Sequence, residues 1–302
     1  MKNLTLALDW TPNINHIGFF VAKEKNFYQE NGLNLNIIDP TEDNYKVTPA
    51  KKVELGLADF ALCPTESILS YRTKTTPFNL IAIAAILKDD LSAIVVKNNG
   101  KIKSPKDLDG KSYSSYQAKY EDAIVKQMIK NDGGKGDLTI AYPNKLGIWD
   151  TVLNDAFDAT WIFLNWEAIE AEGLDHSVSY FKMKDYHIPY SYSPVIAANE
   201  NKIQQNASDY TKFLSATKAG YLFCQEHEEE AITLFKKYVP EKDAHINLNK
   251  ALKASLDAFG NNENWGKLET SVISEFLDWI YAKDLETQKI MVQDIATNQL
   301  MI

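Results

Sequence analysis

Cysteine is scarce in this 302-residue sequence, basic residues are outnumbered by acidic ones, and no long apolar run is present. The two cysteines, Cys63 and Cys224, are too few for a disulfide scaffold or a four-thiolate zinc or iron–sulfur site. The 41 acidic and 32 basic residues argue against nucleic acid as a partner, because duplex binding requires Lys and Arg to neutralise phosphates. No stretch approaches the roughly 18 consecutive apolar residues of a membrane helix. We therefore expect no membrane span and no polybasic membrane patch.

Common motifs of catalysis and metal binding are also missing. The sequence has no G-x-S-x-G nucleophile elbow, no H-E-x-x-H metalloprotease motif and no phosphate-binding P-loop. The glycine-rich run Gly133–Gly136 follows a predicted helix, whereas a dinucleotide fingerprint must follow a strand. We interpret it as a helix end and a turn. The residues themselves predict no metal site and no cofactor.

The length and the apolar content are those of a two-lobed globular protein. The chain of 302 residues is longer than one hydrophobic core usually serves, and 45% hydrophobic residues exclude disorder. Met1–Trp10 alternates between apolar and polar residues, which is typical of a strand and not of a signal peptide. We expect a cytoplasmic protein if Met1 is the native start, and a periplasmic or surface-anchored one if a leader was removed.

Alternating strands and helices begin the chain, and helices end it. The pattern predicts a strand at Leu4–Leu8, a helix at Gly18–Asn31 and a strand at Leu33–Ile38, which together form a parallel unit. Further strands are predicted at Leu91–Val96, Lys111–Ser115 and Pro194–Ala198, and a helix at Tyr120–Asn131. Amphipathic helices are predicted at Asp209–Glu226, Glu229–Tyr238, Leu248–Phe259 and Glu269–Ala282.

Two distant segments have the same pattern. Val53–Glu66 and Val152–Glu167 each contain a helix end, a tight turn, an aspartate, a short apolar strand and a loop with a glutamate. We interpret them as one element that occurs once in each of two similar α/β lobes. The predicted first lobe comprises residues 1–90 and 196–302, and the predicted second lobe comprises residues 91–195. Ligands of open α/β sheets bind beyond the carboxyl ends of the strands, so we expect the loops there to meet in a cleft between the lobes.

The loop after the first strand holds the strongest candidates for ligand binding. Asp9, Trp10, Asn13 and His16 place an aromatic ring and several polar groups within eight residues. Asn13 can also simply bond the turn backbone and cap the next helix, but this alternative leaves Trp10 and His16 unexplained. We expect Trp10 to stack on a ligand and the polar groups to provide directed hydrogen bonds.

The predicted second lobe has similar residues. Trp161 and Phe163 share one face of a strand, and Trp166 and Glu167 follow it. Core packing is the alternative explanation for these aromatic residues. Lys119 is the candidate cation for an acidic group on the ligand, or else an ordinary exposed lysine. The remaining candidate ligand-binding residues are Thr65, Glu66, Tyr116, Tyr120, Tyr190 and Tyr192. A small, flat, polar heterocycle suits such a set best.

Five segments resemble a known family. Asp9–His16, Ala58–Ala61 and Asp158–Phe163 are similar to segments of the thiamine pyrimidine-precursor group of periplasmic-binding-protein-like domains, as are Asn264–Gly266 and Phe276–Tyr281 near the end. The resemblance covers most of the chain. It implies a two-lobed periplasmic-binding-protein-like (type II) α/β fold with a cleft between the lobes and two hinge crossings.

The same resemblance implies one of two functions. Some members are substrate-binding subunits of ABC importers, which capture formylaminopyrimidine or hydroxymethylpyrimidine-like compounds and deliver them to a permease. Others are fungal-type pyrimidine synthases, which use pyridoxal phosphate and iron. Where the synthases have a lysine and a histidine, this chain has Cys63 and Ser67, and Ile188–Pro194 lacks their cysteine cluster. We therefore expect binding without turnover.

Two alternatives stay open. The first is an intracellular enzyme of thiamine pyrimidine biosynthesis that uses His16 as an acid or base. The second is a binder of sulfonates or carboxylates, in which an arginine would normally face the ligand; Arg72 is predicted to lie too far out for that role.

Overall fold

The computed structural model describes residues 1–174 and 176–301, and the chain divides into two compact units. Unit 1 comprises Met1–Asp90, Ser191–Ser274 and Gln288–Ile302, and unit 2 comprises Leu91–Tyr190 and Glu275–Thr287. The lobe boundaries drawn from the sequence differ from these units in residues 191–195 and 275–287. The second of these segments belongs to unit 2 because Phe276 packs on Tyr190 and Glu286 pairs with Lys119.

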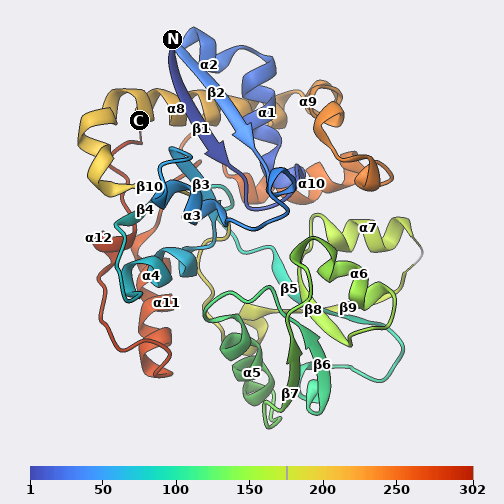
Figure 1. Ribbon diagram of the computed structural model, residues 1–302. Helices are drawn as coiled ribbons and strands as arrows, with labels where there is room; N and C mark the ends of the chain where they lie inside the picture. The colour runs from blue at the N-terminus through green and yellow to red at the C-terminus, as the bar shows by residue number, and fades with distance from the viewer. Residues whose placement is uncertain (175, 302) are drawn as a thin grey trace. The chain divides into compact units, whose positions relative to one another are not determined.

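Unit 1 is built on a five-stranded sheet with the order β2-β1-β3-β10-β4 (Figure 1). Its strands are β1 (Lys2–Ala7), β2 (Leu33–Ile38), β3 (Phe60–Cys63), β4 (Leu80–Ala85) and β10 (Val195–Asn199). β1 pairs in parallel with β2 and β3, which confirms the predicted parallel unit. β10 runs antiparallel to both β3 and β4.

Helices surround this sheet. They are α1 (Ile17–Glu24), α2 (Phe27–Glu30), α3 (Pro49–Glu54), α4 (Thr65–Thr73), α8 (Glu200–Glu226), α9 (Glu228–Phe235), α10 (Leu248–Phe259), the first part of α11 (Thr270–Ala282) and α12 (Val292–Ile295). The prediction of one helix over Gly18–Asn31 was wrong. Asn26 adopts a left-handed φ of 63° and separates α1 from α2, because left-handed backbone cannot continue a right-handed helix.

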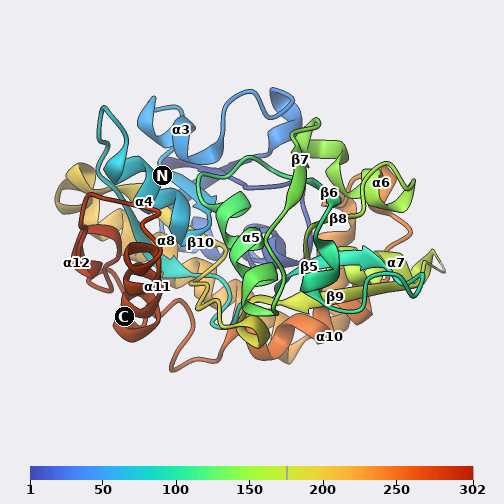
Figure 2. The same cartoon turned by 90° about the horizontal axis from the view of Figure 1, so that it is seen from below.

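Unit 2 repeats the same plan with the order β7-β6-β8-β5-β9. Its strands are β5 (Ser92–Lys97), β6 (Lys111–Ser114), β7 (Leu138–Ala141), β8 (Ala159–Phe163) and β9 (Val178–Lys182). Its helices are α5 (Glu121–Asn131), α6 (Ile148–Leu153) and α7 (Glu167–Gly173). α5 lies beside β7 (Figure 2). β6 pairs in parallel with β7 and β8, and β5 runs antiparallel to its two neighbours.

Short 3-10 helices connect these elements. They are η1 (Ile14–His16), η2 (Pro40–Glu42), η3 (Pro105–Leu108), η4 (Lys145–Gly147), η5 (Met183–Tyr186), η6 (Lys236–Tyr238) and η7 (Glu241–Asp243). The glycine-rich run after α5 is a helix end, as predicted, because the amide of Gly134 bonds to the carbonyl of Ile129. In the described ranges, no helix combines the length and the apolar character needed to cross a bilayer.

The predicted repeat is confirmed by matching hydrogen bonds. In unit 1, the Asp59 carboxylate accepts a hydrogen bond from the amide of Thr5 at 2.8 Å, and the Asp59 amide donates to the carbonyl of Thr5. In unit 2, Asp158 makes the same pair of bonds with Ser112, also with 2.8 Å to the carboxylate. In both units, an aspartate therefore fixes the start of one strand against its parallel neighbour.

Two glycines allow α1 and α8 to pack closely. A Cβ on Gly220 would lie 2.1 Å from the carbonyl oxygen of Gly18 and 2.8 Å from the Cβ of Ala22. A Cβ on Gly18 would lie 2.2 Å from the ring of Tyr221. The contact between the two helices therefore requires a residue without a side chain at both positions.

We expect Gly220→Ala to destabilise unit 1 by about 1–3 kcal/mol, the usual cost of overpacking a core. The matched control is Gly173→Ala at the end of α7, where a Cβ meets open space. Urea unfolding followed by circular dichroism measures both variants. Equal transition midpoints for the two would contradict the packing argument.

Candidate functional site

The carboxyl ends of the parallel strands in unit 1 lie at one edge of the sheet, which we call the unit 1 edge. The loop after β1, the loop Asp39–Thr48 after β2 and the start of α4 after β3 all begin there. A hydrogen bond from Tyr45 Oη to the carbonyl of Asp9, at 2.6 Å, connects the first two segments. The Thr65 amide donates to the carbonyl of Tyr192, just before β10, at 3.0 Å. The structure thus gathers the candidate residues of unit 1 at this edge.

His16 orients the carboxylate of Asp9. The His16 ring is fully buried, and its Nδ1 accepts a hydrogen bond from the amide of Asn13 at 3.2 Å. The proton of the neutral ring therefore lies on Nε2, which donates to Asp9 Oδ1 at 2.8 Å. Because both ring nitrogens are engaged, His16 serves as a support for Asp9. In the part of the chain that the structure describes, Asp9 Oδ2 has no hydrogen-bond partner, and the side chain is 20% exposed.

Asn13 closes the same loop. Its side-chain oxygen accepts from the Asn15 amide at 2.9 Å, and its side-chain nitrogen donates to the carbonyl of Thr11 at 3.2 Å. The structure therefore shows the turn-capping role that was the alternative for Asn13. Trp10 is partly exposed, and its ring centroid lies 5.9 Å from that of Tyr45.

Thr65 and Tyr192 form contacts within unit 1. Thr65 Oγ1 donates to the carbonyl of Tyr192 at 2.8 Å, and Tyr192 Oη accepts from the Glu269 amide at 3.0 Å. Burial raises the pKa of Tyr192. Glu66 is buried in the first turn of α4, where the helix dipole favours a negative charge. Arg72 pairs with Glu200 at 2.7 Å and donates to the carbonyl of Leu80, so its charge is already satisfied.

Unit 2 has an aromatic surface on β8. Trp161 and Phe163 are partly exposed, whereas Thr160 before them and Ile162 between them are buried. The two rings therefore share the face of β8 that points away from the core containing Ile162. Trp161 lies 5.0 Å from Tyr190 between ring centroids. Core packing alone therefore does not explain Trp161 and Phe163.

Trp166 and Glu167 hold the turn that follows β8. Trp166 is 3% exposed, and its amide donates to the carbonyl of Phe163. Glu167 Oε2 accepts a hydrogen bond from the amide of Phe163 at 2.9 Å. These contacts give both residues a structural role at the start of α7.

The loop after β6 contains the other predicted residues of unit 2. Lys119 is ion-paired with Glu286 at 2.5 Å, and Tyr120 Oη donates to the same carboxylate at 2.9 Å. Lys119 is thus not an ordinary unpaired surface lysine. The Tyr116 amide donates to Glu121 Oε1 at 3.0 Å, so this loop is held by two glutamates.

Three residues of these sites were not predicted: Tyr45, Glu121 and Glu286. Tyr45 follows a parallel strand, so the rule for strand ends could have indicated it. Glu121 begins α5, and nothing in the neighbouring residues signals that it is buried. Glu286 lies 167 residues from Lys119, and no local pattern connects the two.

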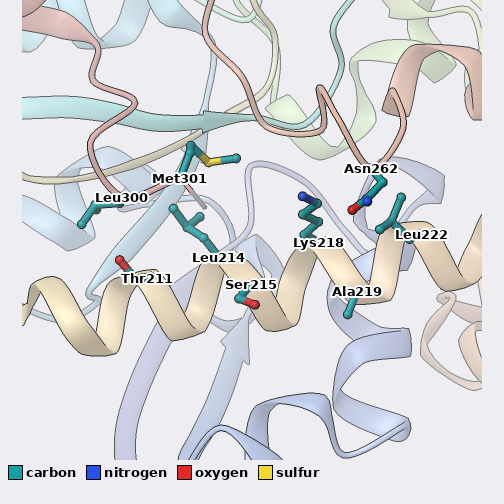
Figure 3. Close-up of a pocket in the computed structure, with 9 residues that line it drawn as sticks. All are labelled: Thr211, Leu214, Ser215, Lys218, Ala219, Leu222, Asn262, Leu300 and Met301. Atoms are coloured by element: carbon teal, nitrogen blue, oxygen red, sulfur yellow. The ribbon is translucent and has the colours of Figure 1, made fainter.

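A separate hollow of about 330 Å³ lies on unit 1 along α8 (Figure 3). It is lined by Thr211, Leu214, Ser215, Lys218, Ala219, Leu222, Asn262, Leu300 and Met301. In the close-up, Leu214 points from α8 toward Met301. None of the residues predicted from the sequence lines this hollow.

Solved structures define the class of the fold. The chain is similar to the alkanesulfonate-binding protein SsuA of Xanthomonas axonopodis pv. citri, with a TM-score of 0.74, 11% identity and 98% coverage of both chains. It is also similar to the periplasmic aliphatic sulphonate binding protein SsuA of Escherichia coli, with a TM-score of 0.71, 15% identity and full coverage of both chains. The predicted periplasmic-binding-protein-like fold is thereby confirmed.

The sequence profile of the family described as NMT1/THI5 like matches residues 13–231, which is more than half of the chain. The chain therefore belongs to the NMT1/THI5-like family, and its fold is that of periplasmic binding proteins. It is 23% identical to the formylaminopyrimidine-binding protein of Halalkalibacterium halodurans, over 97% of this chain and 89% of that one.

The glutamate in the loop of unit 2 leads to a pH prediction. Glu121 is 3% exposed and accepts hydrogen bonds from Tyr113 Oη at 2.8 Å and from the amides of Tyr116 and Ala118 at 3.0 and 3.2 Å. Burial outweighs these bonds and raises the pKa of Glu121 above 4.5. Protonated Glu121 therefore contributes to the free energy of unfolding. This contribution is fully present below the pKa that Glu121 has in the unfolded chain, and it is lost as the pH rises through the higher pKa of the folded protein.

Glu121→Gln cannot titrate at this position. We expect the free energy of unfolding of the wild type, minus that of Glu121→Gln, to fall as the pH rises from about 4 through the raised pKa. Urea unfolding at a series of pH values measures this difference, and Glu229→Gln reports the same chemical change at an exposed position. A difference that stays constant with pH would contradict the assignment.

Proposed function

We propose that this chain binds a thiamine-precursor-like pyrimidine, of the formylaminopyrimidine or hydroxymethylpyrimidine type, as the substrate-binding subunit of an ABC importer. The observation that carries the proposal is the pair Asp9 and Trp10 at the unit 1 edge. A partly exposed indole lies next to a carboxylate that His16 holds in one orientation. The similarity to a formylaminopyrimidine-binding protein over nearly the whole chain supports this proposal, and the partner would be an ABC permease.

The two side chains suit an aminopyrimidine. An indole stacks on a flat heterocycle, and aromatic pairs contribute about 0.5–1.5 kcal/mol beyond the burial of their surface. An ionised carboxylate only accepts hydrogen bonds, so Asp9 favours a ligand with an N–H group, such as an exocyclic amine. A hydrogen bond to a charged group contributes roughly 1.5–3 kcal/mol.

We propose ligand contacts for the aromatic surface of unit 2 as well, through Trp161, Phe163 and Tyr190. The partial exposure of Trp161 and Phe163 supports this role. Micromolar affinity corresponds to about −8 kcal/mol, which requires several contacts of this size. The following residues stay predictions as ligand contacts: Asn13, His16, Thr65, Glu66, Tyr116, Lys119, Tyr120, Trp166, Glu167 and Tyr192. The cleft between two lobes also stays a prediction.

A second candidate function is synthesis of the pyrimidine. The chain is 22% identical to the 4-amino-5-hydroxymethyl-2-methylpyrimidine phosphate synthase of Legionella pneumophila, over 80% of this chain and 75% of that one. The residues of the present chain do not fit the pyridoxal phosphate and iron that the resemblance implies for the synthases. Cys63 stands in place of the lysine, is buried in β3, and has its pKa raised by burial. Cys224, the other cysteine, is buried in α8.

Incubation with pyridoxal phosphate tests this second function. We expect no aldimine absorbance and no change in protein mass on incubation, because no lysine stands at the matching position. An absorbance band typical of a Schiff base that stays with the protein through gel filtration would favour the synthase function.

Trp10→Ala tests the proposed binding. Calorimetry with a panel of aminopyrimidines, including formylaminopyrimidine, is expected to show micromolar or tighter binding by the wild type. The variant should lose at least about tenfold in affinity, since 1.4 kcal/mol corresponds to a factor of ten. Trp279→Ala, which removes a partly exposed indole from α11, is the control and should bind normally. No binding across the panel by the wild type would reject the ligand assignment.

Asp9→Asn tests the charge at the unit 1 edge. The loss of a charge-assisted bond should weaken binding about 10–100-fold. Asp59→Asn is the matched control, because Asp59 lies at the opposite, amino-terminal end of the neighbouring parallel strand. Equal affinities of the two variants would remove Asp9 from the site.

A further inference from the structure

The loop Asp39–Thr48 at the unit 1 edge contains two consecutive residues in the left-handed region. Asn44 has a φ of 53° and Tyr45 a φ of 57°. Asparagine adopts this conformation readily, but a residue with a large side chain adopts it only against steric strain. Such strain persists only where the surroundings hold it, and it gathers at functional sites.

Contacts on both sides of Tyr45 hold the strained backbone. The Tyr45 amide donates to the carbonyl of Pro40 at 2.8 Å. Lys52, which is 7% exposed, pairs with Asp43 at 2.9 Å. Thr48 caps α3 by accepting from the amide of Lys51. The position of Tyr45 is therefore determined by the loop and does not result from a flexible chain.

The Tyr45 side chain reaches the two residues that carry the proposed function. Its hydroxyl donates to the carbonyl of Asp9 at 2.6 Å, and its ring lies 5.9 Å from that of Trp10 at an angle of 53°. Burial, followed by the negative charge of Asp9, raises the pKa of Tyr45. The phenol thus keeps its proton and remains a donor at neutral pH.

We propose that Tyr45 is a positioning residue of the ligand site, which fixes the main chain at Asp9 and sets the plane of the Trp10 indole. His16 holds the Asp9 carboxylate and Tyr45 holds the Asp9 carbonyl, so this residue is restrained through both its side chain and its backbone. The ligand-binding part of this inference rests on the proposed function. The restraint that Tyr45 places on the Trp10 ring does not rest on the proposed function, and the first experiment measures it without ligand.

The first experiment uses the full chain labelled with 5-fluorotryptophan. The six tryptophans give six fluorine resonances, and Trp10→Phe identifies the one from Trp10. Tyr45→Phe removes only the hydroxyl and should shift or broaden the Trp10 resonance while the other five stay in place. The control is Tyr238→Phe, which removes a hydroxyl that donates to Glu24 and should leave the Trp10 resonance unchanged.

The second experiment measures affinity for formylaminopyrimidine by calorimetry. Tyr45→Phe should weaken binding about 3–10-fold, and Tyr238→Phe should not weaken it. In the double variant Tyr45→Phe/Trp10→Phe, the loss should be smaller than the product of the two single losses, because Tyr45 acts in part through Trp10.

The outcomes separate the inference from the proposed function. An unchanged Trp10 resonance in Tyr45→Phe overturns the inference, whether or not the wild type binds a ligand. A shifted resonance with unchanged affinity overturns the role of Tyr45 in binding. If the wild type binds no pyrimidine, the proposed function fails, and the ligand-free resonance still supports or overturns the positioning of Trp10.

Discussion

Parallel pairing of β1 with β2 and β3 is the constraint on which the unit 1 site depends. Strands that run in the same direction end at the same edge of the sheet, so residues 9, 45 and 65 lie at one edge although they are far apart in the chain. The bond Tyr45–Asp9 depends on this pairing, and the bond Thr65–Tyr192 depends on the antiparallel pairing of β3 with β10. The same order of strands in unit 2 brings the loops after β6 and β8 to one edge there.

This edge also carries energetic costs that the core does not have. Tyr45 adopts a strained backbone, His16 is a fully buried polar ring, and the buried hydroxyls of Thr11 and Ser191 have no partner within the described ranges. An unsatisfied buried polar atom costs roughly 1–3 kcal/mol. The packed sheet and α8 offset these costs. A rigid edge with oriented polar groups is what small-molecule recognition requires, because groups already in place lose little freedom on binding.

The distinction between binder and synthase depends on a few positions of a fold that both classes share. Cys63 lies inside β3 with a raised pKa, which makes it a core residue and not a reactive thiol. His16 has both ring nitrogens in hydrogen bonds, so the histidine that was considered as an acid or base instead supports Asp9. These residues favour recognition over turnover.

Local patterns in the sequence were sufficient for the elements with regular periodicity and for the repeat. Leu33–Ile38 and Leu248–Phe259 are a strand and a helix with the predicted bounds, and the aspartates 59 and 158 have the same role in both units. These features depend on neighbours in the chain. The pairing of Lys119 with Glu286 and the contact of Tyr45 with Asp9 were decided by the tertiary structure alone. They depend on groups brought together by folding, and no spacing along the chain records which distant residues will meet.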